Sequence, residues 1–266
     1  MTTTTTTTKQ TDGKLSATEI IRRAQEKVKD PKCDALKPIV WIDCEMTGLD
    51  HHNDTIIEIC CLVTDKNLNL IDEQGYESVI HASKETMDAM SEWCVLHHGQ
   101  SGLTEKVINS TKTREQVEQE LLAYLDKYMN KGVGILAGNS VHMDRLFMLK
   151  DMPRVVDHLT YRIIDVSSVM EIAKRFNPTV ANGRPKKKGA HTAREDILES
   201  IQDLVYYRGV YLKSPAEADK AAVAAFLESP AWTGTSASSK DQPADSSPKD
   251  NTEPVAPRHV AKKRKI

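Results

Sequence analysis

The chain has 266 residues and a formal net charge of −2 at pH 7. This balance argues against a protein that coats long nucleic acid, because such proteins carry a large basic surface that displaces counterions. The five cysteines are odd in number and show no C-x-x-C spacing, which argues against a disulfide framework or a structural zinc site and favours a reducing compartment. No apolar run approaches the roughly 20 residues that cross a bilayer, so we expect a soluble, intracellular protein that binds no membrane.

Both ends of the chain differ in composition from the middle. Residues 1–35 form a low-complexity extension with a run of threonine, and residues 20–29 follow a capping box and predict a short helix, either transient or part of a transit segment. The chain from about Ser236 onward is rich in Ser, Asp, Pro, Lys and Ala and ends in a basic stretch, so we expect residues 214–266 to form a disordered tail. A single folded domain is therefore predicted over residues 36–213.

The domain is predicted to begin with a β-meander. Residues 39–42 (IVWI) are typical of a buried strand, and residues 55–63 (TIIEICCLV) predict a second one. A third strand is expected near residues 68–71, and residues 76–80 indicate either its continuation or a fourth strand.

Helices and strands alternate in the second half. Capping-box patterns at residues 113–116 and 192–195 predict two helices, and a further helix is expected between Asn139 and Pro153. Short strands are expected at residues 134–137 and 161–166. The inward face of the last helix is predicted to carry Ile197, Ile201, Leu204 and Val205. This order indicates a mixed α/β sheet with helices packed on it.

Two acids stand at the end of the first apolar strand. Asp43 and Glu45 are two residues apart and therefore share one face of a strand. One interpretation is that the strand ends there and both acids are solvated. The other is a site for a hard cation such as Mg²⁺ or Mn²⁺, because adjacent carboxylates repel each other unless a cation lies between them.

Three further residues are weak signals when each is taken alone. Asp144 is compatible with an ordinary surface acid, and Asp196 with an acid favoured by the dipole at a helix start. His191 precedes the same helix, where the turn brings its imidazole near Asp196, although a single histidine is more often structural than catalytic.

Five segments in order extend this pattern across most of the domain: residues 41–49 (WIDCEMTGL), 57–59 (IEI), 138–145 (GNSVHMDR), 161–167 (YRIIDVS) and 191–200 (HTAREDILES). Together they resemble the DEDDh exonucleases and, within them, the oligoribonuclease family. The resemblance implies a ribonuclease-H-like mixed β-sheet flanked by α-helices, in a single domain with disordered N- and C-terminal extensions. Cys44, the long basic loop before His191 and the tail beyond Leu212 depart from the family pattern.

The resemblance also implies a mechanism. Asp43, Glu45, Asp144 and Asp196 are expected to bind two divalent metal ions, Mg²⁺ or Mn²⁺, that stabilise the attacking and leaving oxygens of an in-line displacement. His191 is expected to act as general base on the attacking water. The reaction would degrade short single-stranded RNA from its 3′ end to nucleoside 5′-monophosphates.

Substrate contacts follow from the same family match. The expected positions are Met46, Thr47, Leu49, Trp93, His98, Ser140, Arg145 and Tyr161, with Leu49 as an apolar wedge between the last two bases. Trp93 has an alternative role in core packing. Tyr161 resembles a tyrosine that reaches the active site of the partner subunit, which implies a homodimer. Residues 186–188 (KKK) would either lie near the 5′ phosphate or simply be solvated.

Two other functions and several compartments stay open from the sequence. One alternative is a general exonuclease of the same superfamily that acts on long single-stranded RNA or DNA, and another is a catalytically silent RNA-binding adaptor. The acid-poor N-terminal extension favours a mitochondrial location, whereas residues 261–265 (AKKRK) resemble a nuclear-localisation stretch, so cytosol and nucleus remain alternatives.

Overall fold

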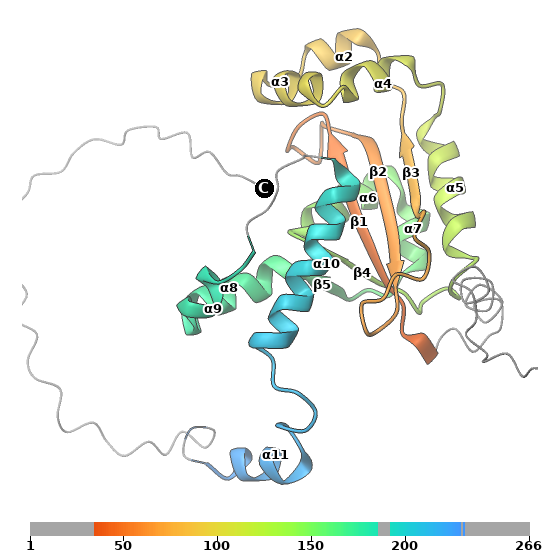
Figure 1. The fold of residues 1–266 in the computed structure, drawn as a ribbon. Helices are drawn as coiled ribbons and strands as arrows, with labels where there is room; N and C mark the ends of the chain where they lie inside the picture. Colours follow the sequence, from red (N-terminus) through yellow and green to blue (C-terminus); the bar gives the residue numbers. More distant parts are fainter. Residues whose placement is uncertain (1–34, 186–191, 230, 232–266) are drawn as a thin grey trace, which may run out of the picture. The chain divides into compact units, whose positions relative to one another are not determined.

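The computed structural model describes residues 35–185, 192–229 and 231. In the first of two units, the described residues between 35 and 207 are built on a five-stranded mixed sheet with strand order β3-β2-β1-β4-β5 (Figure 1). The strands are β1 (Ile39–Met46), β2 (Ile56–Thr64), β3 (Tyr76–Val79), β4 (Ile135–Gly138) and β5 (Ile163–Asp165). β1 and β3 pair antiparallel with β2, whereas β4 pairs parallel with β1 and with β5. The predicted mixed α/β sheet is therefore confirmed.

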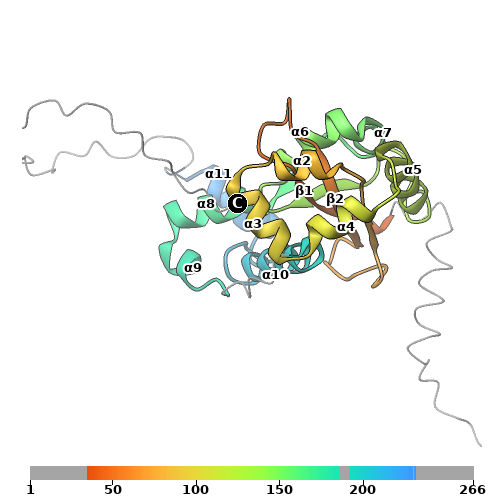
Figure 2. The same cartoon turned by 90° about the horizontal axis from the view of Figure 1, so that it is seen from above.

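Helices cover both faces of this sheet (Figure 2). α6 (Val141–Asp151) and α7 (Pro153–His158) lie on one side of β1 and β2, and α10 (Ala193–Val210) lies on the other. The remaining helices are α2 (Lys84–Asp88), α3 (Glu92–Gln100), α4 (Leu103–Asn109), α5 (Arg114–Leu125), α8 (Val166–Phe176) and α9 (Pro178–Asn182). Within the described part of the chain, no helix is both long enough and apolar enough to span a membrane.

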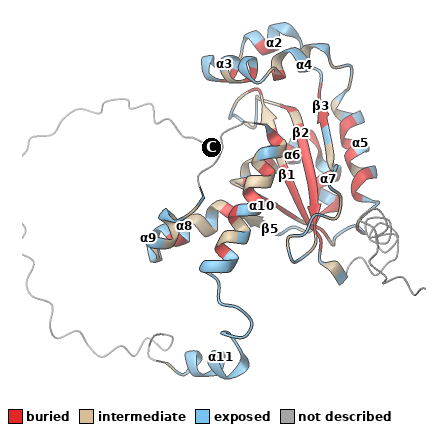
Figure 3. Cartoon of the chain, viewed as in Figure 1, coloured by how far each residue is buried: buried red, intermediate tan, exposed pale blue. Residues whose placement is uncertain are grey.

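The alternation of side chains along β1 separates the core from the candidate site. Val40 and Ile42 belong to the main hydrophobic cluster, which they share with buried residues of β2, α5 and α6 such as Phe147. Asp43 and Glu45 stand at the alternate positions of β1, so they share the opposite face of the strand, and Glu45 lies beside the first turn of α10. Strands β1 and β2 are almost wholly buried (Figure 3), so these acids lie at the end of a rigid, apolar support.

Local signals located the principal helices. The Thr113 hydroxyl accepts a hydrogen bond from the Gln116 amide and the Gln116 side chain accepts one from the Thr113 amide, which is the predicted capping box of α5. Pro153 follows the end of α6 and becomes the first residue of α7, because a proline without an N–H fits the first turn of a helix.

Several expectations from the sequence were wrong. Residues 68–71 form no strand and contribute only an isolated bridge between Thr64 and Leu70, because the Asp65 side chain holds the following residues in a turn. The strand predicted at residues 134–137 is shifted by one residue, to Ile135–Gly138. The strand predicted at residues 161–166 is shortened to Ile163–Asp165. On α10, Ile197 and Ile201 are buried as expected, but Leu204 is half-buried and Val205 is exposed.

The structure describes only part of the two terminal segments of the chain. A second unit begins at Arg208, and among its described residues α11 (Lys220–Leu227) is a helix where the sequence predicted a disordered tail. The short helix expected at residues 20–29, the lysines 186–188, the basic stretch 261–265 and Cys33 lie outside the described residues. Cys44, Cys60, Cys61 and Cys94 are free and buried.

Candidate active site

Glu45 occupies the end of β1, directly across from Glu58 on β2. The register of the two strands shifts between Glu45 and Met46, so the pairing is interrupted where the acid stands. Burial raises the pKa of Glu45 to about 7, and repulsion from Glu58 and then Asp196 adds to this effect. The carboxylate of Glu45 is therefore surrounded by like charge from two other elements.

Asp144 reaches the same end of β1 from α6. Its Oδ1 accepts a hydrogen bond from the Cys44 amide at 3.0 Å, and the residue is buried. Burial raises the pKa of Asp144 to about 7, with repulsion from Glu45 and Asp165 in the same direction, although hydrogen bonds from backbone amides oppose the rise. The fold thus holds a carboxylate where its ionised form is poorly solvated.

Asp196 lies in the first turn of α10 and is half-buried. Its effect on the pKa of Glu45 shows that the first turn of α10 brings this acid close to β1. Asp43 shares one face of β1 with Glu45. The pKa of the buried Cys44 thiol is raised most by burial, then by the charge of Asp144, and then by the charge of Asp43. The four predicted acids therefore come from β1, α6 and α10. His191 lies outside the described residues.

The chemistry of these side chains fits a hard divalent cation. Carboxylate oxygens are the preferred ligands of Mg²⁺ and Mn²⁺. Burial above all, and repulsion between carboxylates in addition, raise the pKa values of Glu45 and Asp144, and a cation would offset both effects. Among the described residues, however, no three His, Cys, Asp or Glu side chains are gathered closely enough to hold an ion in this arrangement. The acids are neighbours around Glu45 without forming a closed cluster.

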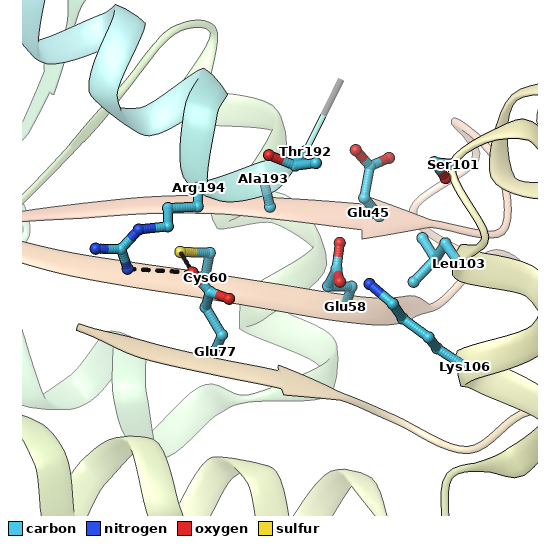
Figure 4. Close-up of a pocket in the computed structure, with 10 residues that line it drawn as sticks. All are labelled: Glu45, Glu58, Cys60, Glu77, Ser101, Leu103, Lys106, Thr192, Ala193 and Arg194. Atoms are coloured by element: carbon cyan, nitrogen blue, oxygen red, sulfur yellow. Dashed lines mark hydrogen bonds and ion pairs between the residues drawn. The ribbon is translucent and has the colours of Figure 1, made fainter. Parts of the chain in front are cut away.

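A cavity of about 190 Å³ opens beside Glu45 on the α10 face of the sheet. Figure 4 shows Glu45 and Glu58 on neighbouring strands, with the Lys106 ammonium beside Glu58. Arg194 closes the far end, where its guanidinium binds Glu77 at 3.2 Å and the Gln74 carbonyl oxygen at 2.6 Å. These contacts attach the first turn of α10 to β3 and so help to hold Asp196 near the sheet.

The three large substrate-contact candidates are exposed. Leu49, Trp93 and Tyr161 have exposed fractions of 62%, 63% and 76%. The Trp93 ring stacks on His97 with centroids 3.9 Å apart, so the alternative of core packing for Trp93 is wrong. The Arg162 guanidinium lies 5.0 Å from the Tyr161 ring centroid. Exposed rings and an exposed leucine are suited to contact bases.

His98 is buried and acts on the backbone next to Glu45. Its Nε2 lies 3.0 Å from the Met46 carbonyl oxygen, and because that oxygen only accepts, Nε2 carries the proton. Burial lowers the pKa of His98, although the bond to Met46 opposes this, so the ring is neutral at neutral pH. The other ring nitrogen, Nδ1, lies 4.0 Å from a Glu45 carboxylate oxygen, and because the ring is neutral the two groups do not form an ion pair.

Ser140, expected to contact substrate, is fixed by a residue that the sequence analysis did not single out. The Ser140 amide donates to Asp165 Oδ1 at 3.0 Å, and Ser140 adopts a left-handed conformation with φ of 54°. Burial alone would raise the pKa of Asp165, but hydrogen bonds from Ser167, His142 and Ser140 lower it. The available signal was an acid near the end of a predicted strand, two residues before Ser167. Arg145 is half-buried on α6.

Glu58 is the second residue that the sequence analysis missed. It stands on β2 opposite Glu45, and burial raises its pKa while Lys106 opposes the rise. The signal was a single acid inside an otherwise apolar strand, which is rare unless the acid is paired or functional.

Comparisons with known proteins agree with this geometry. The family model described as exonuclease (RNase T) matches residues 40–204. The mitochondrial oligoribonuclease of Saccharomyces cerevisiae is 56% identical over 208 residues, which are 75% of this chain and 77% of that protein. The mitochondrial oligoribonuclease of Homo sapiens is 46% identical over 182 residues, which are 68% of this chain and 76% of that protein.

A solved structure shares the fold. Exonuclease I of E. coli in complex with an oligonucleotide matches with a TM-score of 0.52 and 15% identity, over 65% of this chain and 41% of that chain. This chain therefore spans less than half of the exonuclease I chain, and the likeness shows the fold alone. The family match covers β1, α6 and most of α10, the elements that carry the four acids. The chain belongs to the oligoribonuclease family of exonucleases.

Proposed function

We propose that this enzyme hydrolyses short single-stranded RNA from its 3′ end and releases nucleoside 5′-monophosphates. The observation that carries the proposal is the gathering of acids at the end of β1, where Asp144 of α6 accepts the Cys44 amide and burial above all raises the pKa of Glu45 and Asp144. Carboxylates with perturbed pKa values at the end of a central strand and beside a cavity are typical of catalytic sites. The names of the relatives support the choice of short RNA as substrate.

We propose Asp43, Glu45, Asp144 and Asp196 as ligands of two divalent metal ions, Mg²⁺ or Mn²⁺. When bound, the ions would supply positive charge that stabilises the attacking and leaving oxygens at the scissile phosphate. Glu45 and Asp144 must lose their protons before they act as ligands, and their pKa of about 7 places this step near neutral pH.

The proposed acid–base group is His191. A neutral imidazole near this site would take a proton from the attacking water, because its ordinary pKa lies close to neutrality. His98 has a different part: as a neutral donor to the Met46 carbonyl oxygen it fixes the backbone beside Glu45.

Substrate binding is proposed to use the exposed apolar side chains. Leu49 would separate the last two bases, and Trp93 would contact the terminal base, since stacking on an aromatic ring is independent of base identity. Tyr161 is proposed to reach the active site of the partner subunit in a homodimer, which its exposed fraction of 76% permits. The remaining proposed contacts are Met46, Thr47, His98, Ser140 and Arg145.

A mitochondrial location is proposed because the Saccharomyces cerevisiae and Homo sapiens relatives are named mitochondrial. Imaging of the full chain with a C-terminal fluorescent tag tests this proposal. Co-localisation with a mitochondrial marker supports it, and a diffuse cytosolic or nuclear signal contradicts it.

The activity test uses 5′-labelled RNAs of increasing length, from dinucleotides to about two dozen nucleotides, with Mg²⁺ or with a chelator. Asp196→Asn and Glu195→Gln form a matched pair, because each removes one negative charge from the same turn of α10. We expect short RNAs to disappear fastest, only with Mg²⁺, with Glu195→Gln active and Asp196→Asn inactive. Preference for long strands would indicate the general exonuclease, and binding without cleavage would indicate the silent adaptor.

A further inference from the structure

The loop between β1 and β2, residues 47–55, is closed at its base by a pair of threonines. The Thr47 amide donates to the Thr55 carbonyl oxygen at 3.0 Å, and the Thr55 amide donates to the Thr47 hydroxyl at 3.1 Å. This loop carries Leu49 at an exposed position. The direction of the Leu49 side chain therefore depends on how firmly the base of the loop is held.

Asp54 orders the interior of the loop. Its carboxylate accepts hydrogen bonds from the Thr47 hydroxyl at 2.9 Å and from the Asp50 amide at 2.9 Å. Gly48 packs so closely on this carboxylate that a Cβ at position 48 would lie 2.3 Å from Asp54 Oδ2. The residues on both sides of Leu49 are thus fixed relative to Thr47.

The base of the loop is attached to two helices by a group of three residues, Thr55, Arg114 and Asp151, here called the Asp151 cluster. Asp151, at the end of α6, accepts hydrogen bonds from the Thr55 hydroxyl at 2.8 Å and from the Ile56 amide at 2.9 Å. Arg114, at the start of α5, donates to the Thr55 hydroxyl at 2.7 Å and lies 3.3 Å from the Asp151 carboxylate. The Thr55 hydroxyl therefore bridges a cation and an anion.

The burial of Asp151 makes this cluster specific. Its side chain has an exposed fraction of 0%, and a buried carboxylate is tolerated only where donors and counter-charges compensate for lost water. Lys150 adds a second cation 3.7 Å from Asp151 and donates to the Asp54 carbonyl oxygen. Four donors or cations, namely the Thr55 hydroxyl, the Ile56 amide, Arg114 and Lys150, thus converge on the point where the loop enters β2.

The two ends of α6 bind the two ends of the β1–β2 connection. Near its start, Asp144 accepts the Cys44 amide of β1, and at its end Asp151 accepts the Ile56 amide of β2. A rigid helix therefore sets the distance between the acid at position 144 and the loop that carries Leu49. None of the catalytic candidates needs the Asp151 cluster as a ligand or proton donor.

We infer that the Asp151 cluster is a positioning element for RNA binding: it fixes the loop of Leu49 without touching the substrate. The inference rests on the proposed function, in which Leu49 contacts the terminal bases. Loss of the cluster should weaken the binding of short RNA and leave the catalytic step almost unchanged, because Asp144 and Glu45 are held by separate contacts.

The test compares Thr55→Val with Thr55→Ser. Valine keeps the β-branched shape and removes the bridging hydroxyl, whereas serine keeps the hydroxyl and is the conservative rescue. Tyr128→Phe serves as a structural control, because it removes one hydroxyl, which donates to Asp72 at 3.1 Å, from another part of the molecule. If Thr55→Val does not fold, Arg114→Gln provides a second test, because Arg114 is the half-exposed residue of the cluster and its replacement is easier to tolerate.

The first readout is the Kd of an RNA dinucleotide with a hydrolysis-resistant phosphorothioate linkage, measured with Mg²⁺, and the second is kcat and KM on the ordinary dinucleotide. We expect Thr55→Val and Arg114→Gln to raise Kd and KM by about tenfold, since small displacements of positioning groups are costly. We expect kcat to change less than about twofold. Thr55→Ser and Tyr128→Phe should match the wild type in both readouts.

An unchanged Kd in folded Thr55→Val and Arg114→Gln overturns the inference, and so does an equal rise in Tyr128→Phe. A wild type that binds the dinucleotide but does not cleave it overturns the proposed function alone, because the Kd comparison still decides the positioning role. A wild type that does not bind the dinucleotide overturns both.

Discussion

Replacement of Asp144 by asparagine should abolish activity and yet stabilise the metal-free protein. Asparagine keeps an oxygen that accepts the Cys44 amide and removes the buried charge. The pKa of Asp144 rises from 3.8 to about 7 on folding, and a tenfold change in acidity corresponds to about 1.4 kcal/mol. The ionised carboxylate therefore destabilises the fold by up to about 4 kcal/mol at pH 8.

The sign of this effect depends on pH and metal. Because the pKa in the folded state lies above the ordinary value, the penalty is fully present above pH 7 and is relieved as pH falls from about 7 towards 4. The advantage of Asp144→Asn should therefore shrink by about 1 kcal/mol between pH 8 and pH 6. With Mg²⁺ the wild type should gain stability through binding, and the variant should gain less.

Urea unfolding with a chelator, at pH 8 and pH 6, measures these differences. Asp165→Asn is the matched control, because hydrogen bonds lower the pKa of Asp165, so its ionised form stabilises the fold and the variant should lose stability. If Asp144→Asn is less stable than the wild type at pH 8 without metal, then burial of charge is not what raises the pKa of Asp144, and the reasoning fails.

Three further predictions follow from individual positions. Gly48→Ala should lower the free energy of unfolding by about 1–3 kcal/mol and reduce activity, because the new Cβ would displace the Asp54 carboxylate. Gly99→Ala in α3 is the control, because its Cβ would meet no atom within 4 Å, and it should raise the free energy of unfolding by about 0.5–1 kcal/mol. Urea unfolding measures both variants, and equal effects would contradict this account. At limiting Mg²⁺, hydrolysis should fall as pH drops below about 7, since protons on Glu45 compete with the cation; added Mg²⁺ should restore the rate, and failure to do so speaks against Glu45 as a ligand. Phe147→Ala should cost about 3–5 kcal/mol, because this fully buried ring belongs to the main core, and a loss below about 1 kcal/mol in thermal or urea unfolding would refute that packing role.

Local sequence signals were sufficient where the structure depends on neighbouring residues. The capping boxes at Thr113 and Thr192 marked the starts of α5 and α10, since a cap needs only a hydroxyl and an amide three residues away. Alternation along β1 placed Asp43 and Glu45 on one face, because the strand period is two residues.

The sequence analysis failed where partners come from distant parts of the chain. The strand expected at residues 68–71 has the composition of a strand, but only Leu70 finds a bridging partner. The helices α2, α3 and α4 are short, and the apolar periodicity of α3 is weak, so no pattern predicted them. The sequence left core packing open for Trp93, and only its exposure of 63% in the structure argues against that role.

The sequence by itself indicated the family and the mixed α/β sheet, and it singled out the four acids that we propose as metal ligands. Only the tertiary structure decided that Asp196 acts on Glu45, that Glu58 stands opposite it, and that α6 holds the β1–β2 loop through the buried carboxylate of Asp151. The physical reason is that the charge and conformation of a side chain are local properties. The pKa of a carboxylate and the direction of a loop are set instead by whatever residues the fold brings beside them.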